Sequence, residues 1–578
     1  MGESRDGMWI DWDLPIRMDD GLLLRADVFR PPQEGTYPVI LTYGPYGKGL
    51  AFQEGYVDQW EIMARQHPDV TTGSSNTYQN WEVVDPEKWV PYGYVCVRVD
   101  SRGAGRSSGY LDVFSPRETR DLYQCIEWAG TQLWSNGKVG LLGISYYAIN
   151  QWHVASLQPP HLAAMCPWEG AADWYRDMTH HGGILCTFWA NWYRKQVFTV
   201  QHGVGERGFK SPVTGELVAG PETLSEEDLV ENRSDLEQEI LDRPLDDDYH
   251  RSRSPTWSLV DVPLLSSANW GGQGLHSRGN FEGFVNAASH KKWLEVHGLE
   301  HWTDFYTDYG RTLQKRFFDH FLKEEDSGWS EQPPVQLQIR TIDGYIQRAE
   351  NEWPLARTQW TRYYLESEDM SLSRRPVDSS GATSFEALGA GLTFATPPLE
   401  HETEITGPVA ARLHVSSSTR DADLFLVLRV LVPDGREVVF QGALDPHTPV
   451  AQGWLRASHR KLDPELSLDY RPYHSHDEIQ PLVPGDVYEV DVEIWPTSVV
   501  VPAGHRIALS VRGTDYEYEG DEPGTRIASF ANELRGSGPF LHDDPRDRPV
   551  DIFGGITTVN TGGPAQSYLL LPVIPGTA

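Results

Sequence analysis

The chain has 578 residues, a formal net charge of −34 and 39% hydrophobic residues, including 21 tryptophans. That length allows about two to four domains, and the apolar content is sufficient for large buried cores. The strong negative charge repels phosphate backbones and anionic lipid surfaces, so we expect no nucleic-acid partner and no membrane partner.

The cysteines of the chain indicate no disulfide framework. Cys96, Cys125, Cys166 and Cys186 are widely spaced, and none forms a C-x-x-C pair. We therefore expect buried free thiols, no metal site and no cofactor. The N-terminus lacks the basic start and apolar core of a signal peptide, and no apolar run reaches about 18 residues. A cytoplasmic protein is the default expectation.

Strands and helices are predicted to alternate through the first part of the chain. The predicted strands are residues 22–30, 39–43, 94–100, 139–142 and 162–166, with a helix at 115–132. Sheet character returns at 262–268 and 292–296, before a helix at 311–323. This alternation favours a mostly parallel sheet with helices on both faces, which is an α/β fold.

Two other regions have a different character. Residues 171–254 lose the strand pattern, and Ser225 and Asp228 match the start of a capped helix, so we predict a helical cap insertion. Beyond residue 333, alternating strands are separated by turn signals, which predicts a β-sandwich of jelly-roll type. The expected strands there are residues 335–340, 410–415, 424–432, 487–494 and 507–511. The expected division is therefore a core at 1–170 and 255–333, an insertion at 171–254 and a sandwich at 334–578.

The run Gly143-Ile144-Ser145 follows a short apolar strand, at the spacing of a nucleophile elbow. In such an elbow a strand turns sharply into a helix and presents a serine hydroxyl at the strand end. The strict pattern G-x-S-x-G has a second glycine where this chain has Tyr147. An ordinary strand-to-helix turn is the alternative interpretation.

A nucleophilic serine needs a histidine as base and an acid to orient that histidine. His301 follows the last predicted core strand, where an α/β-hydrolase carries its base. His297 competes from the same loop, and His276 and His290 lie upstream. The glycine-rich loop at residues 101–109 lacks the G-K-[ST] ending of a phosphate-binding loop, so we do not expect it to bind a nucleotide.

Several motifs in the same order resemble the CocE/NonD-type serine hydrolases, a family that includes ester hydrolases and X-prolyl dipeptidyl peptidases. Residues 143–148 match the family's G-x-S-Y-x-G except at Ala148, and residues 100–107 match its D-x-R-G-x-G-x-S loop. Residues 45–48 match its P-Y-x-K motif. Residues 406–409 and 454–457 resemble signatures of its jelly-roll domain. The resemblance implies an α/β-hydrolase core with a C-terminal jelly roll.

The resemblance also implies an oxyanion hole made by the Tyr46 hydroxyl and the backbone N–H of Tyr146. The family's acid lies in a G-W-x-D motif, but here the same place reads Asn269-Trp270-Gly271-Gly272, which has no carboxylate. A carboxylate on the neighbouring strand end could replace it, and Glu169 follows that strand. The alternatives for the acid are Asp173, then Glu300 or Asp304.

The sequence therefore predicts a serine hydrolase that forms an acyl-enzyme on a small ester or amide substrate. Ser145 would be the nucleophile, His301 the base and Glu169 the acid. Tryptophans of the insertion would form an apolar acyl pocket: Trp168, Trp174, Trp189 and Trp192. The alternatives are an X-Pro dipeptidyl peptidase, an acyltransferase, or a non-catalytic carbohydrate-binding protein with a decayed site. The acyl group, the leaving group and the oligomeric state, including a homo-oligomer, stay open.

Overall fold

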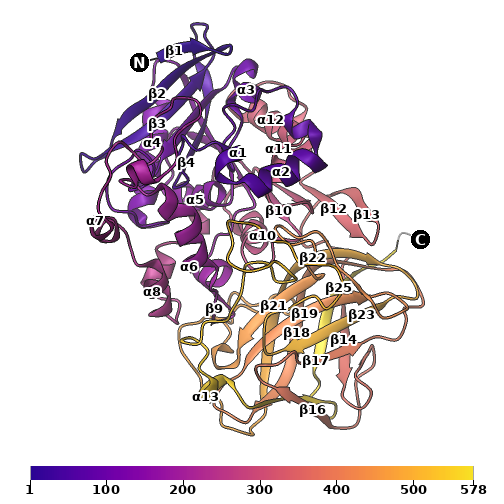
Figure 1. The fold of residues 1–578 in the computed structure, drawn as a ribbon. Helices are drawn as coiled ribbons and strands as arrows, with labels where there is room; N and C mark the ends of the chain where they lie inside the picture. Colours follow the sequence, from indigo (N-terminus) through magenta and orange to yellow (C-terminus); the bar gives the residue numbers. More distant parts are fainter. Residues whose placement is uncertain (1, 577–578) are drawn as a thin grey trace.

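The computed structural model describes residues 2–576, in which two large sheets form the centres of two domains (Figure 1). The first sheet has 11 strands in the order β1-β2-β3-β5-β4-β6-β7-β10-β11-β12-β13. The strands from β5 to β12 run parallel to one another, as the predicted alternation requires. The strands of this sheet are β1 Gly2–Arg5, β2 Met8–Arg17, β3 Leu23–Arg30, β4 Tyr37–Gly44, β5 Val95–Asp100, β6 Ser135–Ile144, β7 Leu162–Trp168, β10 Leu264–Asn269, β11 Lys292–His297, β12 Val335–Thr341 and β13 Gly344–Glu350.

Helices cover both faces of this sheet, so its central strands are apolar on both sides. On β6, Leu141 packs toward α4 and α5, whereas the next residue, Leu142, packs toward α3 and α12. Ser115 caps α4 by accepting a hydrogen bond from the backbone N–H of Glu118, and Pro116 is the first residue of this helix. The helices of this domain are α1 Phe52–Gly55, α2 Val57–Gln66, α3 Pro86–Trp89, α4 Pro116–Gly130, α5 Tyr146–Ala155, α10 Ser277–Asn286, α11 Thr303–Tyr306 and α12 Asp308–Leu322.

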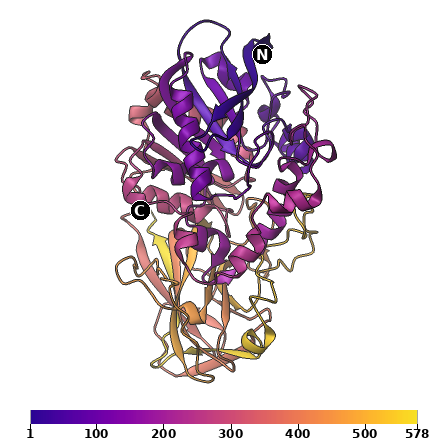
Figure 2. The same ribbon diagram turned by 90° about the vertical axis from the view of Figure 1, so that its left-hand side faces the viewer.

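The regular elements between β7 and β10 are mostly short helices, and this segment runs from the first domain down to the second (Figure 2). The predicted helix start is confirmed, because Ser225 and Asp228 form a reciprocal capping box. The segment also contains a two-stranded hairpin, β8–β9, that the sequence analysis did not predict. Its elements are a π-helical turn Trp174–Thr179, β8 His180–His181, β9 Ile184–Leu185, α6 Phe188–Trp192, α7 Glu226–Glu231, α8 Leu236–Leu241 and α9 Asp248–Arg251.

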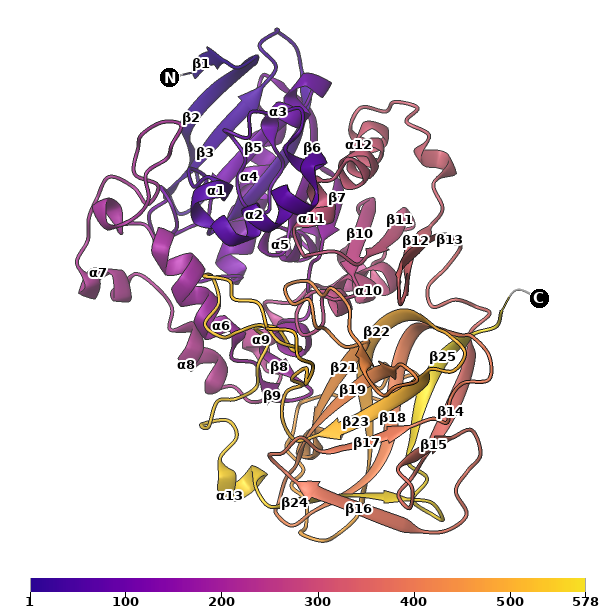
Figure 3. The same cartoon turned by 45° about the vertical axis from the view of Figure 1, so that its right-hand side comes forward.

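The C-terminal domain is the predicted β-sandwich, and its strands close into a ring. The ring runs β18-β22-β21-β19-β23-β17-β15-β14-β25 and returns to β18, while β24 and β16 extend from β18 (Figure 3). Its elements are β14 Gln359–Glu366, β15 Ser371–Ser373, β16 Gly381–Glu386, β17 Leu392–Ala395, β18 Thr403–Ser417, β19 Asp423–Leu431, β20 Glu437–Val438, β21 Ala451–Arg456, β22 Tyr488–Val501, β23 Arg506–Arg512, α13 Val550–Phe553, β24 Ile556–Thr561 and β25 Tyr568–Ile574.

One predicted strand belongs to the other sheet. The sequence pattern places residues 335–340 in the sandwich, but β12 pairs in parallel with β11 and extends the first sheet. The alternating pattern does not make this distinction, because it predicts a strand without identifying its partners; β12 lies between β11 and β13, and most of its residues are buried. No helix within residues 2–576 combines the length and the apolar character needed to cross a membrane.

Candidate active site

Ser145 lies at the sharp turn between β6 and α5. Its backbone has φ 55° and ψ −113°, a strained conformation that non-glycine residues seldom adopt. A Cβ on Gly143 would lie 2.4 Å from the Cβ of Tyr147, so this position needs glycine. Ala148 stands where the family motif has its second glycine, and a Cβ on the facing Gly170 would lie 2.9 Å from the Ala148 methyl. Gly170 therefore provides the close approach that the motif glycine would give, and the elbow tolerates alanine.

The histidine within hydrogen-bond distance of the serine is His276, whose Nε2 lies 3.0 Å from Ser145 Oγ. His276 comes from the loop between β10 and α10, four residues beyond Gly272 of the lost acid motif. His301 lies directly behind it, with the two rings stacked at 4.7 Å and 16°. The structure therefore places both histidines in the cavity at Ser145, with His276 in direct contact with the serine and His301 behind it.

Glu169 holds His301 from the end of β7. Its Oε2 lies 3.0 Å from His301 Nδ1, and its Oε1 lies 3.0 Å from His297 Nε2. Burial alone would raise the pKa of Glu169, but the charge of His301 and the hydrogen bonds from His297 and His301 lower it to about 2. Glu169 has φ 52°, so its backbone is also in the left-handed region.

A second carboxylate, Glu82, contacts the other side of His301, with Oε1 2.8 Å from Nε2. Burial would lower the pKa of His301, but the charge of Glu169 and the hydrogen bonds to Glu169 and Glu82 raise it to about 9. Burial raises the pKa of Glu82 to about 7, against the hydrogen bond from His301. Glu82 has φ 62°, so three strained residues meet around this histidine pair. The sequence analysis missed Glu82, since it lies on an irregular segment outside any predicted strand or motif.

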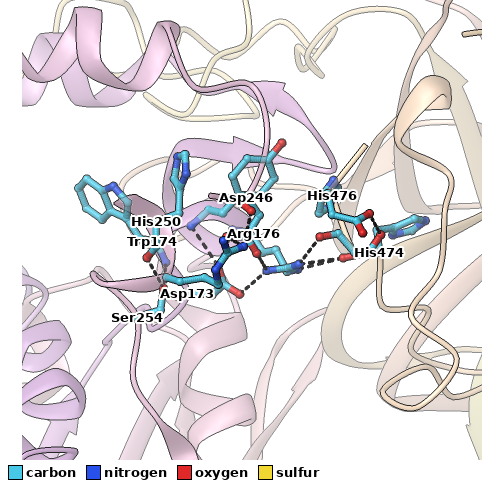
Figure 4. Close-up of polar contacts among 12 residues, drawn as sticks. Asp173, Trp174, Arg176, Asp246, His250, Ser254, His474 and His476 are labelled. Atoms are coloured by element: carbon cyan, nitrogen blue, oxygen red, sulfur yellow. Dashed lines mark hydrogen bonds and ion pairs between the residues drawn. The ribbon is translucent and has the colours of Figure 1, made fainter. Parts of the chain in front are cut away.

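The other candidates for the acid are used elsewhere. Asp173 caps the π-helical turn and binds the Arg176 guanidinium at 2.9 Å, at the contact with the C-terminal domain (Figure 4). Glu300 accepts a hydrogen bond from the Thr303 hydroxyl at 2.9 Å. Asp304 lies 3.5 Å from the Gln338 amide. Among these four acids, Glu169 is the one bonded to His301.

The residues suggested for the oxyanion hole lie beside Ser145. The Tyr46 hydroxyl accepts a hydrogen bond from the Trp192 indole at 3.1 Å. Its own O–H therefore remains able to donate to another acceptor. Asp100 fixes the Tyr46 loop by accepting from the backbone N–H of Lys48 at 2.6 Å. Tyr146 is the first residue of α5, so its N–H has no acceptor one turn earlier in the helix. Its side chain points away and donates to Glu118.

The cavity above the serine has a volume of about 30 Å³, room for about two water molecules. Trp189 and Trp192 line it, as predicted. Trp168 and Trp174 do not line it, because Trp168 stacks on His297 and Trp174 packs behind Trp189. Three apolar side chains of the C-terminal domain complete the wall: Leu444, Phe530 and Phe540.

Known proteins match this chain along nearly its whole length. A family model described as X-Pro dipeptidyl-peptidase (S15 family) matches residues 20–303, and one described as the X-Pro dipeptidyl-peptidase C-terminal non-catalytic domain matches residues 327–569. The crystal structure of a CocE/NonD family hydrolase from Staphylococcus aureus is similar at 32% identity and a TM-score of 0.83, covering 98% of this chain and 94% of that one.

Two further matches have lower identity. The cocaine esterase of Rhodococcus sp. (strain MB1 Bresler) is similar at 26% identity over 634 residues, with 97% of each chain covered. The structure of an α-amino-acid ester hydrolase shares the fold, with a TM-score of 0.65 at 16% identity, covering 99% of this chain and 98% of that one.

Proposed function

Because the chain belongs to the CocE/NonD family of serine hydrolases, we propose that it cleaves an ester or amide bond of a small acyl substrate through an acyl-enzyme on Ser145. The observation that carries this proposal is the strained elbow at Ser145, with Oγ 3.0 Å from an imidazole nitrogen inside an aromatic cavity. The small volume of that cavity favours a short acyl group, with the leaving group outside.

In the proposed reaction, Ser145 Oγ attacks the carbonyl carbon as a histidine takes its proton. The Tyr46 hydroxyl and the Tyr146 backbone N–H donate to the oxyanion that develops. The same histidine returns the proton to the leaving oxygen or nitrogen, and the acyl-enzyme forms. Water then attacks the acyl-enzyme by the same steps and releases the acid. An alcohol or amine in place of water would give acyl transfer.

Two histidines can serve as the base, and we propose His301 acting with Glu169. A histidine whose Nδ1 is held by a buried carboxylate is the arrangement of a catalytic triad. His276, in contrast, has a buried Nδ1 with no acceptor among the described residues. Glu82 must release the His301 Nε2 before His301 can act. Because the pKa of Glu82, about 7, lies below that of His301, about 9, the shared proton rests on His301, which becomes a base only after losing that proton. His276 would then hold the serine hydroxyl in the free enzyme.

Kinetics of the acylation step decide between these histidines. We expect His301→Asn to slow single-turnover acylation by an activated ester about 10³- to 10⁴-fold, and His276→Asn to slow it much less. The reverse order would make His276 the base and leave His301 as a charged neighbour.

An active-site probe tests the proposal as a whole. A fluorophosphonate should label the wild-type chain at Ser145, and Ser145→Ala should abolish both labelling and hydrolysis of p-nitrophenyl esters. A folded wild-type chain that resists labelling would instead favour a non-catalytic binding protein.

A substrate panel separates esterase from X-Pro peptidase activity. Release of an X-Pro dipeptide requires a group that binds the substrate's free amino terminus. Among the described residues that line the cavity, Glu82 is the one with a carboxylate, and that carboxylate is already bonded to His301 Nε2. We therefore expect short acyl esters to be hydrolysed with much higher kcat/KM than X-Pro p-nitroanilides. A preference for the anilides would assign the peptidase activity.

A further inference from the structure

A second cluster of reactive side chains lies where the helical insertion meets the C-terminal domain. His181 ends β8, Cys186 follows β9, and His542 lies in the long segment between β23 and α13. All three residues are buried, and one donor atom from each lies within 4.8 Å of the other two. Figure 3 shows β8 and β9 beside β21 at this junction. None of the three belongs to the serine site.

The hydrogen bonds of the two imidazoles fix how they face each other. His181 Nε2 lies 3.0 Å from the backbone carbonyl of Asp177, which can only accept, so Nε2 carries the proton. His542 Nδ1 lies 2.8 Å from the Asp515 carboxylate, so it also carries its proton there. The remaining nitrogens, His181 Nδ1 and His542 Nε2, lie 2.8 Å apart and each presents a lone pair to the other. Two lone pairs at this distance repel unless a cation lies between them.

We propose that His181 Nδ1, His542 Nε2 and Cys186 Sγ bind a transition-metal ion, with Zn²⁺ as the expected occupant. Imidazole nitrogen and thiolate sulfur are the ligands that zinc prefers. A shared proton would satisfy the two nitrogens but would leave the nearby thiol without a role. The fourth ligand of a tetrahedral zinc bound by three residues is a water molecule.

The surroundings match those of histidine ligands in metal sites. Such histidines donate their other ring N–H to a carboxylate or a backbone carbonyl, as His542 does to Asp515 and His181 to Asp177. One thiolate and the Asp515 carboxylate would also balance the two positive charges of the ion. Two imidazole nitrogens on one tetrahedral zinc lie about 3.3 Å apart, so binding widens the present 2.8 Å gap by about 0.5 Å.

The position of this site gives the ion a structural role. The segments that carry Cys186 and His542 also pair with each other. The backbone N–H of Thr187, next to Cys186, donates to the carbonyl of Leu541, next to His542, at 2.8 Å. Phe188 follows Thr187 and Phe540 precedes Leu541. Their rings pack against each other with centroids 5.0 Å apart, and both line the serine cavity. A metal ion bound here would therefore clamp the outer wall of the cavity across the domain boundary.

Metal analysis of the full-length chain tests the proposal. After expression with zinc and dialysis against metal-free buffer, we expect about one Zn²⁺ per wild-type chain by mass spectrometry. The Co²⁺-substituted chain should show a thiolate-to-cobalt absorption band, which Cys186→Ser removes. His542→Ala should also lower metal content at least tenfold. Cys125→Ser removes another buried free cysteine, outside the cluster, and should keep both the metal and the band.

Circular dichroism and the melting temperature check that each variant is folded, so loss of metal can be separated from loss of structure. The proposal is overturned if the folded wild-type chain binds neither Zn²⁺ nor Co²⁺. It is also overturned if folded Cys186→Ser keeps the metal and the absorption band.

Discussion

The two groups of buried histidines differ in charge although burial acts on both in the same direction. Beside Ser145, the carboxylates Glu169, Glu82 and Glu295 raise the pKa values of His301 and His297. At the domain junction, burial lowers the pKa values of five histidines, and positively charged or histidine neighbours lower them further; these are His180, His181, His459, His474 and His476. Figure 4 shows His474 and His476 beside Arg176. The contacts with Glu169 thus keep His301 and His297 charged, whereas these five histidines, which bond no carboxylate among the described residues, stay neutral, the state in which imidazole binds metals.

The largest effect should follow from removing the central carboxylate of the serine site. Glu169→Gln keeps the shape of the side chain but cannot balance the charge of His301, so we expect kcat to fall about 10³- to 10⁴-fold. The measurement is steady-state hydrolysis of a p-nitrophenyl ester. Asp173→Asn is the matched control, because Asp173 binds Arg176 instead, and its kcat should stay near that of the wild type. Near-normal activity of Glu169→Gln would remove Glu169 from the mechanism.

At the junction, the corresponding change is Asp515→Asn. The Asp515 carboxylate orients His542 through Nδ1, and loss of such a contact typically weakens metal binding about 10- to 100-fold. Competition with a chromophoric chelator measures this affinity. An unchanged affinity would mean that His542 is not a ligand.

A smaller change, Glu82→Gln, tests which histidine is the base through the position of the acidic limb in the pH profile. Removing this charge should lower the pKa of His301 from about 9 by about one to three units. If His301 is the base, the acidic limb of kcat/KM moves to lower pH by the same amount. If His276 is the base, the limb stays in place, because the pKa of His276 lies well below its usual value and His301 is protonated in that pH range with or without Glu82. A shifted limb therefore assigns His301 as the base, and an unmoved limb assigns His276.

The smallest effect concerns stability. His301 has a pKa of about 9 in the folded chain against an ordinary 6.5, so its stabilising contribution is complete below pH 6.5 and is lost as pH rises through 9. Glu169, at about 2 against 4.5, contributes fully above pH 4.5 and loses its contribution as pH falls through 2. We expect the melting temperature to fall by a few degrees between pH 6.5 and 9, and to fall less in Glu169→Gln. Equal slopes in the two proteins would contradict the assigned charge of His301.

Much of the fold could be predicted from local sequence. Apolar runs and turn signals locate the core strands within a few residues, as for β5 and β11, and the G-x-S run locates the elbow. The assignment of β12 failed because strand pattern does not encode the strand's partner. The insertion was predicted as helical. The strands of its β8–β9 hairpin have two residues each, too few to show the alternation of apolar and polar residues that predicts a strand.

The candidate site was predicted in part. Strand order explains how Glu169 could be identified, because β7 adjoins β6 and its end faces the elbow. Glu82 carries no motif, since its position depends on a backbone turn with positive φ. His276 was named as an upstream competitor of His301, but no motif selected it from the 20 histidines of the chain. The metal ligands His181 and His542 are 361 positions apart, so no spacing rule could pair them.

The cavity wall formed by Leu444, Phe530 and Phe540 means that the second domain shapes the space in front of Ser145. Substrate range could therefore be redesigned by mutating these distant loops while every reacting group stays intact. By the same reasoning, a protein that ended after β13 would lack one wall of the cavity beside Ser145.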